Sequence, residues 1–167
     1  MRRLVAPALA VCAALLFGAQ APAQQPAPTP TPPLPPTTPY GAPITLDQAK
    51  RAADAAEAES KKRNTFIAIA VVEPSGDLVY FRRMDGTQYG SIKTSQAKAI
   101  SAALYRRASK SFRERVAQGD LSPMALEGAV ASDGGVPIAV NGKIIGAIGV
   151  SGGADDALAQ AGADALK

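Results

Sequence analysis

Histidine is missing from this chain of 167 residues, tryptophan is missing too, and cysteine occurs once, at position 12. Without histidine the chain cannot build a Ser-His-Asp or Cys-His catalytic arrangement, a histidine-based zinc or iron site, or a histidine-ligated haem. Most hydrolase classes are therefore excluded. The chemistry left to the chain uses oxygen atoms, lysine, arginine and the backbone.

The N-terminus has the three regions of a secretory signal peptide. Arg2 and Arg3 precede an apolar run over residues 4–17, and small residues end in Ala21-Pro22-Ala23. The run is shorter than the ~20 residues that span a bilayer, so no stable membrane anchor is expected after cleavage. We predict a signal peptide over residues 1–23 and a secreted or periplasmic protein.

Signal cleavage changes what the exported chain contains. Cys12 is preceded by Val11, a context unsuited to lipid attachment. Cleavage removes this cysteine, so no disulfide, thiol nucleophile or thiolate metal site remains. It also leaves 16 basic against 14 acidic residues, and the net charge falls from +4 to +2. A charge this small does not imply a nucleic-acid partner.

Residues 24–42 are rich in proline and threonine, which favours extended polyproline II over a packed core. We interpret this stretch as a linker. The remaining residues, 43–167, have the length and apolar content of one folded domain.

Capping and turn signals divide this domain into helices and hairpins. Thr45 and Gln48 fit a capping box, and Asn141-Gly142 joins two apolar runs as a hairpin turn. The expected elements are a helix over 45–63, strands over 66–72 and 78–81, helices over 91–107 and 110–117, strands over 136–140 and 144–150, and a helix over 154–166. The buried stripe of the helix over 91–107 is expected at Ala97, Ala102, Ala103 and Leu104. This order predicts an α/β (α+β) domain around an antiparallel sheet.

Ser151-Gly152-Gly153 stands where the last predicted strand meets the last predicted helix. Unpaired amides at a helix start can hold an anion, and glycines allow its close approach. The alternative is that the glycines only make the turn while Ser151 caps the helix.

Three charged residues are further candidates for binding. Arg83 and Asp85 follow a predicted strand, where charged side chains commonly form a solvated rim. Lys98 lies on an alanine-rich predicted helix, on or beside the face that carries Thr94. It becomes a candidate anion ligand if that face lines a cleft.

The blocks ITLDQAKRAADAAEAES, AIAVVEPSGDLVYFRRMDG, SQAKAISAALY and GGVPIAVNGKIIGAIGVSGG resemble the GlcG/HbpS family over essentially the whole domain. The resemblance implies a profilin-like three-layer α/β/α fold with a central antiparallel sheet, and a homo-oligomer. Members include secreted haem-binding proteins that partner a sensor kinase, a protein of glycolate-utilisation operons, and the C-terminal domain of PduO-type corrinoid adenosyltransferases. The family is thus defined by its fold more than by one activity.

The resemblance also transfers ligand candidates, namely Arg83, Asp85, Lys98, Ser151, Gly152 and Gly153. The haem-binding members use histidine or threonine as a ligand, and this chain departs from them in having no histidine. Haem contact would therefore fall to Thr94, Tyr89, Tyr105 or Met84, or haem would be held weakly between subunits.

Three functional hypotheses follow. The first is an exported, non-catalytic small-molecule-binding protein, for haem or a related tetrapyrrole, that works as an oligomer. The second is an enzyme acting on a small carboxylated metabolite, with Lys98 and Arg83 holding the carboxylate and Asp85 as the acid/base group. The third is a signalling or structural module that binds a membrane sensor protein without a ligand.

Overall fold

The computed structural model describes residues 34–35 and 37–167, so the predicted signal peptide and most of the predicted linker lie outside the described residues. These residues belong to one of two compact units of the chain, Pro32–Lys167. Its elements run in the order α1 (Leu46–Lys62), β1 (Ala68–Val72), β2 (Leu78–Arg83), α2 (Gly90–Tyr105), α3 (Lys110–Ala117), a 3-10 turn (Ser122–Ala125), β3 (Gly135–Val140), β4 (Lys143–Ser151) and α4 (Asp155–Asp164). The predicted order of helices and hairpins is confirmed.

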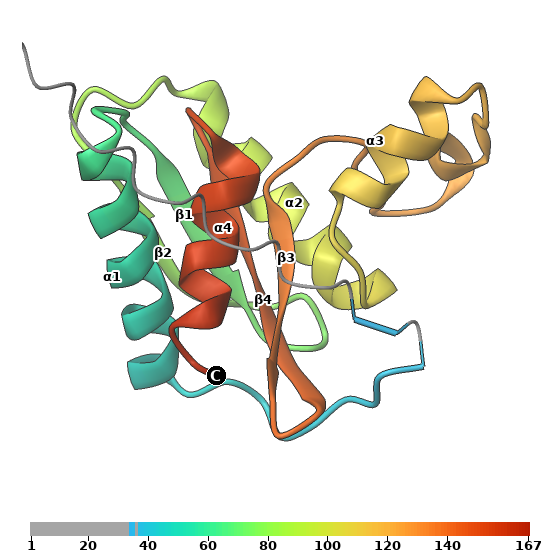
Figure 1. The fold of residues 1–167 in the computed structure, drawn as a ribbon, viewed down its shortest axis with the longest axis horizontal. Coiled ribbons are helices and arrows are strands. Elements are labelled where there is room, and N and C mark those ends of the chain that lie inside the picture. The colour runs from blue at the N-terminus through green and yellow to red at the C-terminus, as the bar shows by residue number, and fades with distance from the viewer. Residues whose placement is uncertain (1–33, 36) are drawn as a thin grey trace, which may run out of the picture. The chain divides into compact units, whose positions relative to one another are not determined.

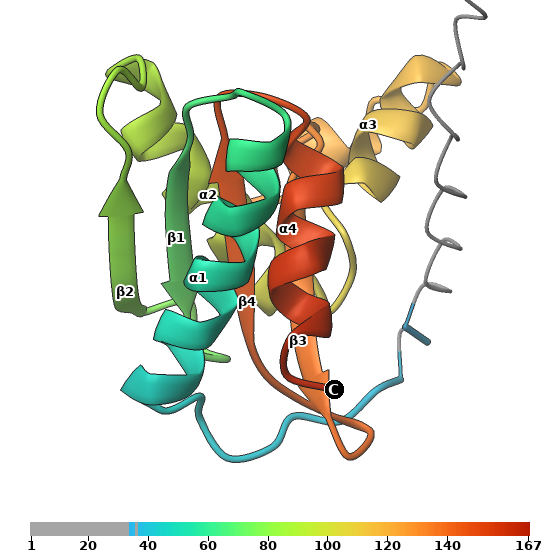
Figure 2. The same ribbon diagram turned by 60° about the vertical axis from the view of Figure 1, so that its left-hand side comes forward.

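The four strands form one antiparallel sheet in the order β2-β1-β4-β3. The β3–β4 hairpin turns at Asn141 (φ 50°) and Gly142 (φ 73°), the left-handed pair that a two-residue type I′ turn requires. Helices α1 and α4 cover one face of the sheet, and α2 covers the other (Figures 1 and 2). The predicted three-layer α/β/α arrangement is therefore correct.

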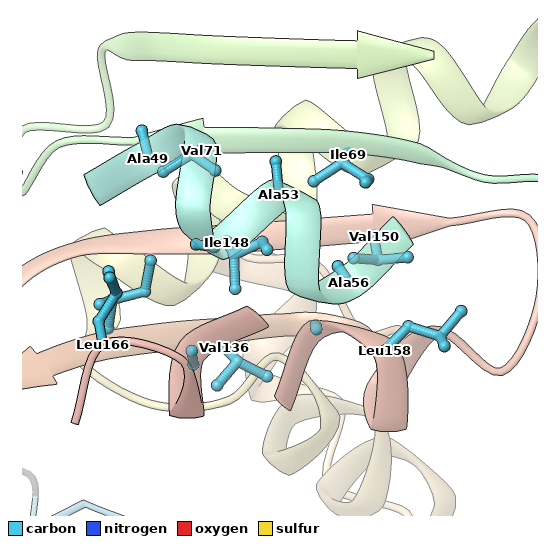
Figure 3. Close-up of a cluster of buried hydrophobic side chains, with 14 of the residues drawn as sticks. Ala49, Ala53, Ala56, Ile69, Val71, Val136, Ile148, Val150, Leu158 and Leu166 are labelled. Carbon is cyan, nitrogen blue, oxygen red and sulfur yellow. The ribbon is translucent and has the colours of Figure 1, made fainter. Parts of the chain in front are cut away.

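The main hydrophobic core lies between the sheet and the α1–α4 pair (Figure 3). Ile69 and Val71 point to this side from β1, while the neighbouring Ala70 and Val72 belong to the cluster on the α2 side. This alternation follows from the two-residue period of a strand. Helix α1 starts with the predicted capping box, since the Thr45 hydroxyl accepts from the Gln48 amide at 3.3 Å and the Gln48 side chain accepts from the Thr45 amide at 2.9 Å.

Helix α2 lies unusually close to the sheet, because small residues face each other across this layer. A Cβ added at Gly149 would lie 2.0 Å from the Ser95 carbonyl oxygen. Ala102 and Ala103 are buried as predicted, but Ala97 is only half-buried and Leu104 is 43% exposed. The predicted stripe was thus partly wrong, since the buried residues of α2 also include Ser91, Ser95, Lys98, Ala99 and Ser101.

Residues 38–44 pack along β4 where it extends beyond β1. The Gly41 amide donates to the Ile144 carbonyl at 2.8 Å, and the Ile144 amide donates to the Pro39 carbonyl at 2.9 Å. The Tyr40 hydroxyl donates to the Ala103 carbonyl at 2.8 Å. The last residues of the predicted linker therefore belong to the packed domain. Within the residues that the structure describes, no helix has the length and apolar character needed to cross a membrane.

Candidate functional site

One end of the domain gathers most of the predicted site residues. There β1 begins, β2 and β4 end, and α2 and α4 begin (Figures 1 and 2). Phe66 links these segments, because a Cβ added at Gly86 would lie 3.6 Å from its ring and one added at Gly152 would lie 2.3 Å from its carbonyl oxygen. We call this region the loop end and define it by Phe66, Arg83, Asp85, Tyr89 and residues 151–153.

Arg83 and Tyr89 form a cation–π pair at the loop end. The guanidinium carbon of Arg83 lies 5.4 Å from the centroid of the Tyr89 ring. Tyr89 is 80% exposed, and Phe66 is 53% exposed, so two aromatic surfaces and a positive charge face solvent here. Asp85 is exposed beside them.

The hydroxyl groups of the tyrosines differ in what they contact. Tyr40 and Tyr105 donate to main-chain carbonyls, at 2.8 Å to Ala103 and 2.7 Å to Glu127, and the Tyr80 hydroxyl accepts from Arg82 at 2.8 Å. Tyr105 also packs edge-on against Phe112, with ring centroids 5.2 Å apart. Of the described residues, none hydrogen-bonds the Tyr89 hydroxyl. Of the two predicted tyrosine contacts, only Tyr89 is thus exposed with an uncommitted oxygen.

Thr94 and Met84 are less suited to bind a ligand than Tyr89. The Thr94 hydroxyl is exposed on α2 and donates to the Gly90 carbonyl at 2.9 Å. Met84 is half-buried against the main core, and its sulfur lies 3.7 Å from the Ser60 hydroxyl. The Thr94 hydroxyl proton and the Met84 sulfur thus each have a partner within the domain.

Lys98 is buried inside the domain. Its side chain is 2% exposed, and its ammonium donates to Asp155 Oδ2 at 2.7 Å and to the Val150 carbonyl at 3.2 Å. The helix face that carries Lys98 packs on the sheet, so the cleft on which its anion-binding role depended is not there. The enzyme hypothesis therefore has no free ammonium at this position to hold a substrate carboxylate beside Arg83.

Residues 151–153 form a turn whose polar groups are largely committed. Ser151 ends β4, and its hydroxyl contacts the Ser91 hydroxyl at 3.3 Å, so it does not cap α4 as one interpretation expected. The N-cap of α4 is Ala154, which makes no side-chain cap. Gly152 has φ 131°, which favours glycine, and the Gly153 amide donates to Asp155 Oδ1 at 2.8 Å. The prediction that glycines shape the turn is borne out.

Arg82 and Arg83 serve different sides of β2. Arg82 turns to α1 and pairs with Asp54 at 2.8 Å and Glu57 at 2.5 Å. Burial opposes its charge, yet the hydrogen bonds that Arg82 donates to Tyr80, Asp54 and Glu57 outweigh burial and raise the pKa of Arg82. Arg83, the next residue, lies on the side of β2 away from α1, at the loop end.

A hollow that the sequence did not predict lies beside the start of α4. It is an open pocket of about 450 Å³ lined by Arg113, Ser132, Asp133 and residues 153–157. Arg113 pairs with Asp133 at 2.6 Å, and Lys110 pairs with Asp156 at 3.2 Å. These ion pairs fasten α3 to the body of the domain, so most charge around the pocket is already neutralised.

The described residues contain no group of three or more acidic side chains placed to hold a metal ion. They do contain an orphaned polar atom near the loop end. Thr87, two residues before Tyr89, is 7% exposed, and its hydroxyl oxygen has no hydrogen-bond partner among the described residues. A buried hydroxyl without a hydrogen-bond partner costs free energy of folding.

Fold and loop arrangement define the class as a profilin-like three-layer α/β/α domain. Within that class, the family model described as haem degrading protein HbpS-like matches residues 44–164, and the chain belongs to this family. Protein GlcG of Escherichia coli K12 is 41% identical over 97 residues, which cover 58% of this chain and 72% of GlcG.

Two solved structures share the fold. A double mutant of Streptomyces reticuli HbpS has 27% identity and a TM-score of 0.69, with 85% of this chain and 99% of that chain covered. A complex of PduOC with haem has 21% identity and a TM-score of 0.68, with 75% and 96% covered. At that identity the second likeness concerns the fold alone.

Proposed function

We propose that this protein is an exported haem-binding protein and that the loop end is where haem binds. The observation that carries the proposal is the Tyr89 hydroxyl, which is exposed and uncommitted in a chain with no histidine. Tyrosine oxygen is an established haem ligand. Of the candidates Thr94, Met84, Tyr89 and Tyr105, Tyr89 is the one whose donor atom has no hydrogen bond among the described residues, and we assign it as the iron ligand.

Neighbouring side chains suit the other parts of a haem. Arg83 is exposed at the loop end, and its guanidinium is a group that binds carboxylates well, such as a haem propionate. The exposed ring of Phe66 offers an apolar surface for the macrocycle. Bound at this end, haem would supply a redox-active iron to the protein surface.

Family membership supports haem as the ligand. The description of the matching family names a haem degrading protein. PduOC, a protein of the same fold, is in complex with haem in its crystal structure. The predicted signal peptide supports action outside the cytoplasm, where capture or sensing of haem has a use.

A titration of the purified chain with hemin tests the proposal. We expect a saturable shift of the Soret band at micromolar concentrations. Tyr89→Phe, which keeps the ring and removes the oxygen, should weaken binding at least tenfold, while Tyr105→Phe at the opposite end of α2 should not. Absence of saturable binding to the unmodified chain would overturn the proposal. Light scattering of the same samples measures the homo-oligomer that the family resemblance implies.

A further inference from the structure

We infer that two copies of this chain pair through the outer face of α2, around a two-fold axis that runs parallel to the helix. Ala97, Ile100 and Leu104 define this surface, which we call the α2 face. Helices α1 and α4 lie together on one side of the sheet, whereas α2 covers the other (Figure 2). No other described helix therefore covers the side of α2 that points away from the sheet.

The α2 face is apolar, although it points to solvent. Its three residues recur at steps of three and four, on the side of the helix opposite the buried Ser95 and Ala102. Ala97 and Ile100 are half-buried, and Leu104 is exposed. The solvent face of α1, by contrast, is charged, and its exposed residues include Lys50, Arg51, Asp54, Lys61 and Lys62. An apolar stripe that the domain leaves uncovered indicates a surface for another chain.

The spacing of the three residues favours a parallel pair of helices. Steps of three and four residues give the narrow seam through which two helices pack in a coiled coil. Around a two-fold axis parallel to α2, each residue of the seam meets the same residue of the second copy, and the small Ala97 lets the helices approach closely. Lys93 lies one turn before Ala97 on the same stripe, so like charges end the seam there. The apolar seam is thus about 10 Å long.

One flank of the α2 face is acidic. The turn between β1 and β2 carries Glu73 and Asp77. A Cβ added at Gly76 would lie 3.4 Å from the side chain of Ile100, so this turn borders the α2 face directly. Each carboxylate accepts from one hydroxyl within the turn, at 3.0 and 2.8 Å, and neither forms an ion pair within the described residues. Two negative charges are therefore available to a partner.

The opposite flank is basic. Arg106 and Arg107 follow the last residue of α2, and the guanidinium carbon of Arg107 lies 5.7 Å from the centroid of the Phe112 ring, on α3. Helix α3 lies beyond β3, at the edge of the sheet away from β2 (Figures 1 and 2). A Cβ added at Gly128 would lie 3.6 Å from Leu104, which places the segment after the 3-10 turn on this flank too. In the part of the chain that the structure describes, neither arginine forms an ion pair with a carboxylate.

The two-fold axis brings these unlike flanks together. Both lie at the same end of the domain, because β1 and α2 each begin at the loop end and run away from it. Rotation about an axis parallel to α2 makes the acidic turn of each copy face the arginines of the other, so the contact occurs twice. Opposite charges that meet in this way fix the orientation of a pair. An antiparallel pair would instead turn the arginines toward the start of α2 in the second copy, where Lys93 adds positive charge.

The flanks also add the area that the seam lacks. A stable pair buries about 800 Å² on each partner, more than a seam of two helical turns offers. Leu78 is exposed beside the acidic turn, and Leu126 is exposed on the basic flank, so each copy brings apolar surface to both sides of the seam. We expect a pair that forms reversibly and dissociates on dilution.

Sedimentation velocity of the whole chain, without hemin, tests the interface. We expect an assembly of at least two copies. Leu104→Glu, which places a carboxylate on the seam, should lower the association constant about tenfold or more, because burial of an unpaired charge opposes association. Leu46→Glu is the matched control, since Leu46 is exposed on α1 at the other face of the sheet, and it should associate as the unmodified chain does. Circular dichroism of each variant checks that it is folded.

An exchange of charge tests the orientation. Asp77→Arg and Arg107→Glu should each associate about tenfold more weakly when alone, because like charges then meet twice. An equimolar mixture of the two variants should recover association, since every contact of the mixed pair joins opposite charges again. Single copies of the unmodified chain at all concentrations, unchanged association of Leu104→Glu, or no recovery in the mixture would overturn the inference. None of these outcomes decides haem binding, which the hemin titration tests separately.

Discussion

Lys98 and Asp155 join the two faces of the sheet through a buried ion pair. The ammonium of Lys98, on α2, lies 2.7 Å from the carboxylate of Asp155, at the start of α4. Lys98 also holds the Val150 carbonyl, and Asp155 holds the Gly153 amide, so both helices are tied to the end of β4. The pair thereby holds the turn at residues 151–153 in place through the Val150 carbonyl and the Gly153 amide.

Asp155→Leu should be strongly destabilising, because it leaves the Lys98 ammonium buried without a counter-charge. The expected loss in the free energy of unfolding is about 3–5 kcal/mol. Urea denaturation measures it. The double variant with Lys98→Met and Asp155→Leu should recover a large part of the loss, since an apolar pair buries no unpaired charge.

A matched control for this prediction is the exposed pair of Lys110 and Asp156, whose side chains are 43% and 36% exposed. Lys110→Met should change the free energy of unfolding by less than about 1 kcal/mol. A similar loss in the free energy of unfolding for Lys110→Met and Asp155→Leu would contradict the importance assigned to the burial of Lys98.

The sequence predicted the elements well, because their signals are local. Thr45 with Gln48, and Asn141 with Gly142, each specify a cap or a turn within a few residues. The partners of Lys98 are 52 and 57 residues away, so no local pattern revealed that this lysine is buried. The same holds for Phe66, which the sequence presented as the start of a strand and which the fold exposes at the loop end.

The loop end was predicted in part for the same reason. Arg83, Asp85, Tyr89 and the turn at 151–153 were each recognised separately, from residue type or family resemblance. Which tyrosine keeps a free oxygen depends on long-range contacts, such as that of Tyr105 with Glu127, and only the structure supplies these. The sequence did not predict the pocket beside α4, because Arg113 and Asp133 have the sequence pattern of any exposed charged residue.

Gly149→Ala should destabilise the layer between α2 and the sheet. The added Cβ would meet the Ser95 carbonyl oxygen at 2.0 Å, and the contact is with backbone, so α2 would have to move. We expect a loss of about 1–3 kcal/mol or more in the free energy of unfolding. Gly90→Ala is the control, since no atom lies within 4 Å of its added Cβ. A loss as large in Gly90→Ala would show that the effect does not come from close packing.

Tyr40→Phe should loosen the segment over residues 38–44 from the end of α2. The variant removes the hydroxyl that contacts the Ala103 and Leu104 carbonyls at 2.8 and 3.1 Å, and a hydrogen bond of this kind contributes about 1 kcal/mol. Chemical denaturation should show that loss, and amide exchange near Gly41 should accelerate. Tyr89→Phe, which loses no internal hydrogen bond, should unfold as the unmodified chain does. No difference between the two variants would contradict the anchoring role of Tyr40.

Asp120 should titrate well below an ordinary aspartate. The hydroxyl and amide of Ser122, together with Arg115, lower the pKa of Asp120 to about 2. Because this pKa is below the unfolded value of about 3.9, the interaction stabilises the turn above pH 4 and is lost as the pH falls toward 2. Carbon NMR of the carboxyl group measures the midpoint. Asp120→Asn should remove the acid-induced change at Ser122, and a midpoint near 4 would contradict the assignment.

Export predicts a defined change in mass. If residues 1–23 direct secretion, the protein recovered from the periplasm or medium should begin at Gln24, lack Cys12, and resist labelling by thiol reagents. Intact-mass spectrometry of that fraction checks all three. Ala21→Leu with Ala23→Leu should block cleavage, because the cleavage site requires small residues, and the precursor should then accumulate with its thiol. Ala154→Leu, in the folded domain, is the control and should be processed normally. Recovery of the whole chain from the cytoplasm alone, with its thiol reactive, would contradict export and leave haem binding to be judged by the hemin titration.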